Sequence, residues 1–420
     1  MRNGKLEKTL NLHYAAMQAT FWMYFGALVG FASVFLLARG FNNSTIGFIL
    51  AISNVLAVVL QLLVANLIDR SKRVTLFGAM GSMTGMLLLI VASLYVIRRA
   101  SVAITVLYVL GLSILMILQP MVNSTKRELE NTGSMINFGF ARGMGSLFYS
   151  ILTSIIGTAV ERRGENAIPV IAAMVIGIFL INLIFTSKAH RAGMAERTAA
   201  PGAAAAVGPA EKAEPAISMR EFVSRHKMFM IFCAATCLIY FSNYVINMYM
   251  AQIAANVGGT SEDVGRIFSL LGIMEVPTMV LYSRISKRFR YTTLIKVSAI
   301  AFSCWIGIVA LGNSVFMLFF AQIVQPFALA LFQPSLVTLI DKSMAKGEAV
   351  RGQTMYTVAT TASAAITGLA GGVVLDLFGA KVLTAAGFIL TAAGAALAIS
   401  IVDRVGRESA GQPLQVKKTS

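Results

Sequence analysis

Charged residues are scarce in this sequence, and acidic residues are scarcer than basic ones. Only 13% of the 420 residues are Asp, Glu, Lys or Arg, whereas 57% are hydrophobic. Soluble domains carry roughly 25% charged residues, so this composition excludes a water-soluble globular fold of this length. The apolar residues gather in runs of about 18 or more, the length that crosses a bilayer as a helix. A helix satisfies its own backbone N–H and C=O groups where lipid offers no partner, so we predict an all-α integral membrane protein.

Groups that bind metals or perform catalysis are also few. The three cysteines lie inside apolar runs and indicate neither a disulfide framework nor a metal site: Cys233, Cys237 and Cys304. The three histidines lie near predicted membrane edges or in a polar segment: His13, His190 and His226. No Walker loop, HExxH or GxSxG motif is present. We therefore expect no cofactor, no metal and no enzymatic activity, and any transport must draw its energy from a gradient.

Long polar segments are limited to one, residues 188–227, which are rich in Ala, Pro, Gly and charge. Such a composition buries too little apolar surface to fold alone, so we interpret it as a cytoplasmic linker. It separates two apolar halves, residues 1–187 and 228–403, with a tail at 404–420. The hydropathy pattern predicts two six-helix bundles with spans near 14–38, 44–68, 74–97, 102–124, 134–160, 167–187, 228–256, 262–284, 292–311, 314–340, 353–378 and 381–402.

The basic residues predict the orientation. The chain has 35 Lys and Arg against 18 Asp and Glu, a net charge of +17. Most Lys and Arg fall in the linker and in alternate short loops, which is typical of the cytoplasmic side of a membrane protein and not of a nucleic-acid-binding surface. We therefore expect a multi-pass protein of the cytoplasmic (inner) membrane with both termini in the cytoplasm, contacting the lipid bilayer and no nucleic acid.

Two ionisable residues stand inside predicted spans, Arg142 in the fifth and Glu275 in the eighth. Ionisable groups are costly in the bilayer, and those present commonly mark a substrate or ion pathway. We predict that Arg142 contacts substrate and that Glu275 loads and releases a proton. The alternatives are a structural ion pair for Arg142 and a helix-packing role for Glu275.

Polar side chains also recur at helical spacing within several spans. Tyr240, Asn243 and Asn247 share a face of the seventh span, Gln322 and Gln325 lie in the tenth, and Asn123 closes the fourth. Interhelical hydrogen bonds would explain any single one of them. Because the stripes occur in so many spans, we predict that they line a shared polar cavity. The candidate substrate-binding residues are therefore Arg142, Asn123, Tyr240, Asn243, Asn247, Gln322 and Gln325.

A charge cluster ends the second span, within the stretch 65–73 that reads ANLIDRSKR. Asp69, Arg70 and Arg73 would form either a solvated turn or a gate that locks the two halves together on the cytoplasmic side. This stretch resembles the loop signature of the major facilitator superfamily, Gly-x-Leu-x-Asp-Arg-x-Gly-Arg-Arg. The leucine, the aspartate and the basic residues match, whereas both glycines are missing. The resemblance implies a twelve-span transporter whose halves rock about a central site.

Within that superfamily the sequence is most similar to the lactose permease branch of sugar–proton symporters. The stretch from Gly139 to Gly145 matches the motif around that branch's essential sugar-binding arginine, which implies a substrate role for Arg142. The Glu-Val-Pro at 275–277 is similar to the eighth span of related permeases, which also holds a functional glutamate. The branch's other acidic and coupling residues are absent, because residues 121–124 read MVNS and the tenth span has glutamines. Lactose is therefore not the expected substrate.

These observations predict a monomeric secondary active transporter. We expect it to move a small polar solute such as a sugar, glycoside or nucleoside, in symport with H+. Uptake of an organic anion held by Arg142 is an alternative. Drug–proton antiport, facilitated diffusion without protons and a membrane sensor that transports nothing also stay open. The fifth span has none of the proline found in the Gly-Pro motif of the drug antiporters, which favours uptake.

Overall fold

The computed structural model describes residues 2–70, 75–199 and 218–408, and every regular element in these ranges is a helix. The first half contains α1 (Arg2–Phe25), the π-helical turn η1 (Gly26–Gly30), α2 (Ala32–Ala38), α3 (Asn43–Arg70), α4 (Leu76–Val96), α5 (Val102–Glu130), α6 (Phe138–Arg163) and α7 (Ala167–Ala199). The second half contains α8 (Met219–Arg225), α9 (Lys227–Asn256), α10 (Ser261–Arg288), α11 (Tyr291–Leu311), α12 (Val315–Ser343) and α13 (Lys346–Glu408). The predicted all-α membrane fold is confirmed.

Twelve passes are made from these helices. Nine described helices are long and apolar enough to span a bilayer, and the pair α1–α2, bent by 43° around η1, acts as a tenth. Helix α13 makes two passes, because Gly379 breaks it at a φ of 80°, a backbone conformation that glycine adopts without steric cost. Helix α10, an apolar helix with Glu275 in its middle and charged residues at its ends, supplies the remaining pass.

The boundaries of the helices follow local sequence signals. Serine, threonine and asparagine side chains accept hydrogen bonds from the free N–H groups of the first turns of α4, α5, α6 and α10, at Thr75, Ser101, Asn137 and Thr260. At the start of α10 the carboxylate of Asp263 also accepts from the backbone N–H of Thr260, which completes a capping box. The segment expected to be a linker is partly helical, because α7 continues to Ala199 and α8 precedes α9.

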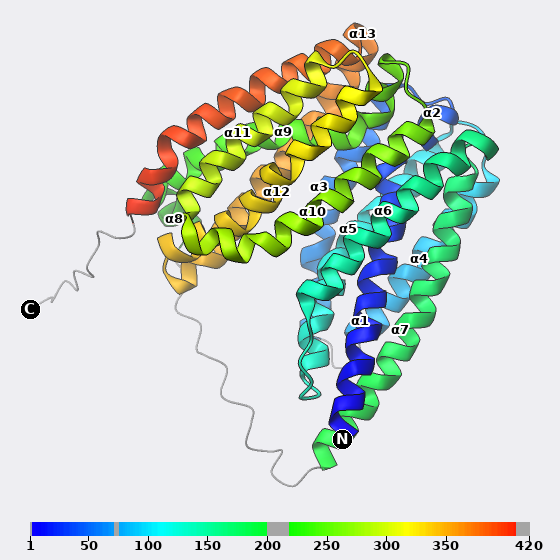
Figure 1. Ribbon diagram of the computed structural model, residues 1–420. Helices are drawn as coiled ribbons and strands as arrows, with labels where there is room; N and C mark the ends of the chain where they lie inside the picture. The colour runs from blue at the N-terminus through cyan, green and yellow to red at the C-terminus, as the bar shows by residue number, and fades with distance from the viewer. Residues whose placement is uncertain (1, 71–74, 200–217, 409–420) are drawn as a thin grey trace, which may run out of the picture.

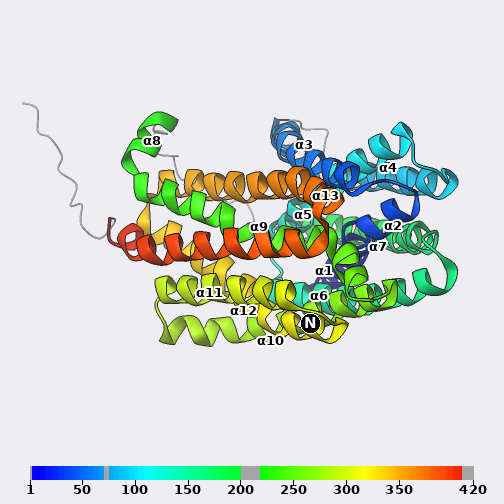
Figure 2. The ribbon, with the colours of Figure 1, turned by 90° about the horizontal axis from the view of Figure 1, so that it is seen from above.

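The helices form two bundles that meet at one end of the molecule and diverge toward the other (Figure 1). We call the end where α7 stops and α8 starts the linker end. The opposite end, which holds Gly379 and the connection from α2 to α3, is the far end. Two helix pairs join the bundles, α3 with α13 and α6 with α10. Viewed from above, these pairs lie on opposite sides of the junction (Figure 2).

Glycines allow both helix pairs to approach closely near the far end. A Cβ atom added to Gly47 of α3 would lie 1.9 Å from the carbonyl oxygen of Gly368 in α13. A Cβ atom on Gly265 of α10 would lie 2.5 Å from the carbonyl oxygen of Thr153 and 2.8 Å from the Cα atom of Gly157 in α6. Any larger side chain at these positions would force the bundles apart, so this end is closed by backbone-to-backbone packing.

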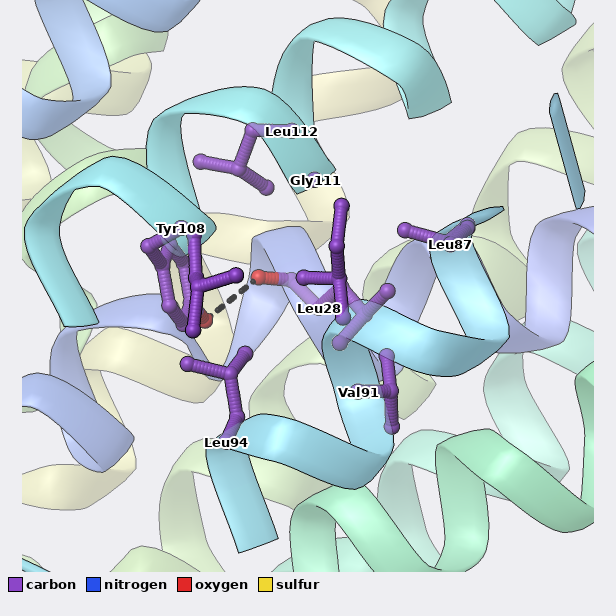
Figure 3. A pocket seen from close by; sticks show the side chains of 9 residues that line it. Leu28, Leu87, Val91, Leu94, Tyr108, Gly111 and Leu112 are labelled. Atoms are coloured by element: carbon purple, nitrogen blue, oxygen red, sulfur yellow. Dashed lines mark hydrogen bonds between the residues drawn. The ribbon is translucent and has the colours of Figure 1, made fainter. Parts of the chain in front are cut away.

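The π-turn η1 has a partner outside its own helix. A π-turn leaves the regular helical hydrogen-bond pattern, and the hydroxyl of Tyr108 in α5 donates a hydrogen bond to the carbonyl oxygen of Leu28 at 2.9 Å. Around this bond lies a hollow between α4 and α5 whose other lining side chains are aliphatic (Figure 3). With no charged lining residue, the hollow belongs to the apolar packing of the first bundle.

A buried arginine ties the first bundle together at the far end. Arg39 is only 5% exposed and forms an ion pair with Glu165 at 3.1 Å. Its guanidinium also donates to the side chain of Asn166 at 2.8 Å and to the carbonyl oxygens of Leu94 and Arg98, both at 3.4 Å. One side chain thereby joins the loops after α2, α4 and α6.

We expect Arg39→Met to lower the free energy of unfolding by about 1–3 kcal/mol, because Glu165 and two carbonyl groups lose their charged partner. This loss of stability is smaller than that for a fully buried ion pair, since Glu165 keeps some contact with solvent. The measurement is the midpoint of thermal unfolding of the purified protein in detergent. The control is Lys126→Met, which removes an exposed pair with Glu130 and should cost less than about 0.5 kcal/mol. Equal midpoints for the two variants would contradict this role.

Candidate functional site

A chain of polar contacts links three helices of the first bundle. Gln18 of α1 is fully buried and donates to Asn123 of α5 at 3.0 Å. The indole N–H of Trp22, one turn along α1, donates to the side-chain oxygen of Gln18 at 3.3 Å. The guanidinium of Arg142 in α6 lies over the Trp22 ring, 4.1 Å from its centroid. Asn123 and Arg142, both predicted from the sequence, are thus joined through two residues of α1.

The local sequence of α6 explains how Arg142 reaches Trp22. Arg142 lies in the second turn of α6, after the cap by Asn137. A Cβ atom at Gly145 would lie 2.6 Å from Cδ1 of Trp22, so glycine is needed for the indole to pack against α6. This contact explains why the motif from Gly139 to Gly145 has a glycine at position 145. The cation above the ring adds an attraction of about 0.5–2 kcal/mol.

Arg142 faces the second bundle. Its guanidinium makes one hydrogen bond to the described residues, donating to the hydroxyl of Ser146 at 2.8 Å. The carbonyl of Ser146 would lie 3.1 Å from a Cβ atom on Gly272 in α10. Glu275 is one turn beyond Gly272 on the same face of α10. Its carboxylate attracts the guanidinium across the junction, although the two side chains form no ion pair within 4.0 Å.

Glu275 is held by a residue of the tenth span. Gln325 of α12 is 1% exposed and donates to the carboxylate of Glu275 at 3.2 Å. Pro277 follows two residues later, and as a proline inside a helix it leaves the carbonyl of Ile273 without its usual partner. Gln322 is fully buried one turn from Gln325 and donates to the carbonyl of Leu318 in its own helix at 3.1 Å. Only Gln325 of the two predicted glutamines contacts Glu275.

The predicted stripe on α9 forms a separate set of contacts. Asn247 donates to the side-chain oxygen of Asn243 at 2.9 Å, and both residues are half-buried. The hydroxyl of Tyr240 lies 2.6 Å from the hydroxyl of Tyr356 in α13, while its ring packs against Phe302 and Phe332. Among the residues that the structure describes, no hydrogen bond connects this stripe to Arg142 or Glu275. The Tyr240 ring is part of an aromatic core, and its hydroxyl is the group available for polar chemistry.

The predicted gating residues are Asp69, Arg70 and Arg73. Arg73 lies outside the described residues, as do the side chains of Asp69 and Arg70.

Sequence reasoning missed Gln18, Trp22 and Tyr356. Gln18 and Trp22 are spaced by four residues and therefore share a face of α1, which is a signal that the sequence contains. Tyr356 stands alone among small polar residues of α13, where nothing in the sequence marks it as the partner of Tyr240.

Comparisons with known proteins agree on the class. A model of the MFS_1 like family matches residues 14–386. The nucleoside transporter NupG has a TM-score of 0.73 at 15% identity, over 94% of this chain and 98% of that one. A bacterial homologue of the human lysosomal transporter Spinster, in an inward-facing and unoccupied conformation, has a TM-score of 0.63 at 13% identity, over 96% and 98%. The peptide transporter POT in complex with alafosfalin has a TM-score of 0.68 at 13% identity, over 96% of each chain.

No curated protein matches the chain by sequence. At such low identities the solved structures establish the fold alone. The family model, however, spans most of the chain, and its residues include the Arg142 motif and the span that holds Glu275. The protein therefore belongs to the MFS_1 like family and is a multi-pass membrane transporter of the major facilitator type.

Proposed function

We propose that this transporter moves a small, uncharged polar solute of the nucleoside or sugar class in symport with H+. The observation that carries the proposal is that Arg142 and Glu275 face each other from opposite bundles. Arg142 packs on the Trp22 ring, and Glu275 accepts a hydrogen bond from Gln325. Such a pair offers donors on one side and an acceptor on the other, with the guanidinium held against the Trp22 ring. A ligand rich in hydroxyl groups can use both the donors and the acceptor.

The charges of the pair argue against other solutes. A lipophilic cation would be repelled by Arg142, and an organic anion held by Arg142 would bring its carboxylate toward Glu275. A neutral solute can accept hydrogen bonds from the guanidinium and donate hydrogen bonds to the carboxylate without repulsion from either charge. The fold similarity to the nucleoside transporter NupG supports nucleosides as the first solutes to try. Asn123, Asn243, Asn247, Gln325, Gln322 and Tyr240 would supply further polar contacts as the bundles move.

In the proposed orientation the linker end lies in the cytoplasm. We propose that the protein is a monomer in the inner membrane. The basic residues of the loops at this end support that placement. The far end would then face outward, and its close glycine packing would hold the site shut on that side. Asp69, Arg70 and Arg73 would close the linker end in the opposite conformation.

We expect Arg142→Met to reduce the apparent affinity for uridine by about 10-fold or more, because charge-assisted hydrogen bonds contribute about 1.5–3 kcal/mol. The measurement is saturable uptake of radiolabelled uridine by proteoliposomes, alongside the ligand-induced rise in unfolding temperature. Arg266→Met is the matched control, since Arg266 is exposed and pairs only with Glu262 of its own helix. Unaltered uridine uptake by the Arg142 variant would refute the substrate role. If the parent protein binds neither uridine nor glycosides, the proposed solute class fails.

We expect Glu275→Gln to abolish uphill accumulation of substrate while exchange across the membrane continues. The amide keeps a side chain that can pair with Gln325 but cannot load or release a proton. The two readouts are accumulation driven by an imposed proton gradient and exchange at equal substrate concentrations on both sides. Glu262→Gln in the first turn of the same helix is the control and should behave as the parent protein does. Proton-driven accumulation that persists in the Glu275 variant would place the coupling elsewhere.

A further inference from the structure

One aspartate crosses the junction at the far end and caps a helix of the other bundle. Asp376 lies in α13, three residues before the break at Gly379, and its carboxylate faces the first turn of α3. One carboxylate oxygen accepts from the backbone N–H and the side-chain amide of Asn43, at 3.1 and 2.9 Å. The other accepts from the backbone N–H and the hydroxyl of Ser44, at 2.8 and 2.5 Å. Two consecutive residues thus give four hydrogen bonds to one side chain.

These bonds complete the cap of α3. The first N–H groups of a helix have no partner within it and carry a positive partial charge, which favours a carboxylate. Asn42 of the same bundle accepts from the N–H of Thr45 at 2.9 Å. The N–H groups of Asn43 and Ser44 depend on Asp376 instead. The second bundle therefore supplies the acceptor for the first two N–H groups of α3.

A further residue of the second bundle strengthens the arrangement. Gln252 of α9 donates to the side-chain oxygen of Asn43 at 2.9 Å, so Asn43 is held from two sides. Gly372, one turn before Asp376, is so close that a Cβ atom there would lie 2.4 Å from the carbonyl oxygen of Asn43. Separation of the bundles at this end would break all of these contacts together.

Asp376 differs in kind from the rest of the far-end junction. The glycine contacts of α3 with α13 and of α6 with α10 are uncharged backbone packing. Among the described residues, Asp376 is the only ionised side chain that hydrogen-bonds from one bundle to the other. The strength of its bonds therefore depends on charge, and no cation within the second bundle is needed to hold it.

We propose that Asp376 is the positioning residue of a gate at the far end. Its carboxylate caps α3 and thereby sets the equilibrium between the conformation open at the far end and the conformation open at the linker end. Opening at the far end separates the carboxylate, which is already exposed to solvent in this structure, from the N–H groups of Asn43 and Ser44. Removal of the Asp376 charge should therefore shift the equilibrium toward the conformation open at the far end. This role goes beyond the proposed substrate and proton coupling and does not depend on either.

The test measures access to the far end without any substrate. Ser33, which is 3% exposed and donates to the carbonyl oxygen of Met248 in the other bundle, is replaced by cysteine in a chain lacking Cys233, Cys237 and Cys304. The rate at which a membrane-impermeant maleimide labels this cysteine is followed in the full-length protein in lipid nanodiscs. We expect Asp376→Asn to raise the labelling rate by about 10-fold, which corresponds to about 1.4 kcal/mol in the opening equilibrium.

Asp403→Asn is the matched control. Asp403 also lies in α13 and is paired, but its partner Lys296 belongs to the same bundle. Its labelling rate should stay within about twofold of the parent rate. A rate for Asp376→Asn within that same range, in protein that keeps its unfolding midpoint, would overturn the proposal.

Variants on the α3 side keep the test decisive if Asp376→Asn does not fold. Ser44→Ala and Asn43→Ala each remove a side-chain donor and should raise the labelling rate by about two- to fivefold. Their effects should largely vanish in the Asp376→Asn background, because residues in one hydrogen-bond network are not additive. If neither alanine variant changes the labelling rate, that result alone is enough to reject the proposed gate.

Discussion

The low tolerance of the bilayer for unpartnered polar groups is the constraint on which this structure depends. A helix facing lipid satisfies its backbone but cannot place an ionised side chain there. The junction between the two bundles is where such groups can lie, and Arg142 and Glu275 both face it. The outer faces instead carry exposed apolar residues such as Leu62, Leu89 and Ile181.

Much of the fold could be predicted from the sequence, because the hydropathy of each span is local information. The twelve passes, the two-bundle division and the family follow from long apolar runs and from the loop motif, and the comparisons confirm them. The bend at η1 and the continuation of α7 to Ala199 could not be predicted. The first depends on a bond from Tyr108 in another helix, and the second on packing such as that of Gly193 against Leu6 and Thr132.

The candidate site was most predictable where a residue is anomalous on its own. A single arginine and a single glutamate stand out in apolar runs, which marks Arg142 and Glu275 whatever their neighbours are. Gln18 and Trp22, which connect Arg142 with Asn123, look like ordinary members of an amphipathic stretch until α1, α5 and α6 are placed together. An aspartate at a span end is normally a solvated loop residue, so Asp376 carries no local signal of its contact with α3.

The position of the site relative to the closed end links packing to transport. The glycine contacts run along α6 and α10 as far as Ser146 and Gly272. Arg142 and Glu275 each lie one turn beyond these residues along α6 and α10, in the direction of the linker end. The bundles diverge toward that end (Figure 1). A ligand that bridges Arg142 and Glu275 would draw the bundles together on the open side, and the far-end contacts could then exchange for contacts at the linker end.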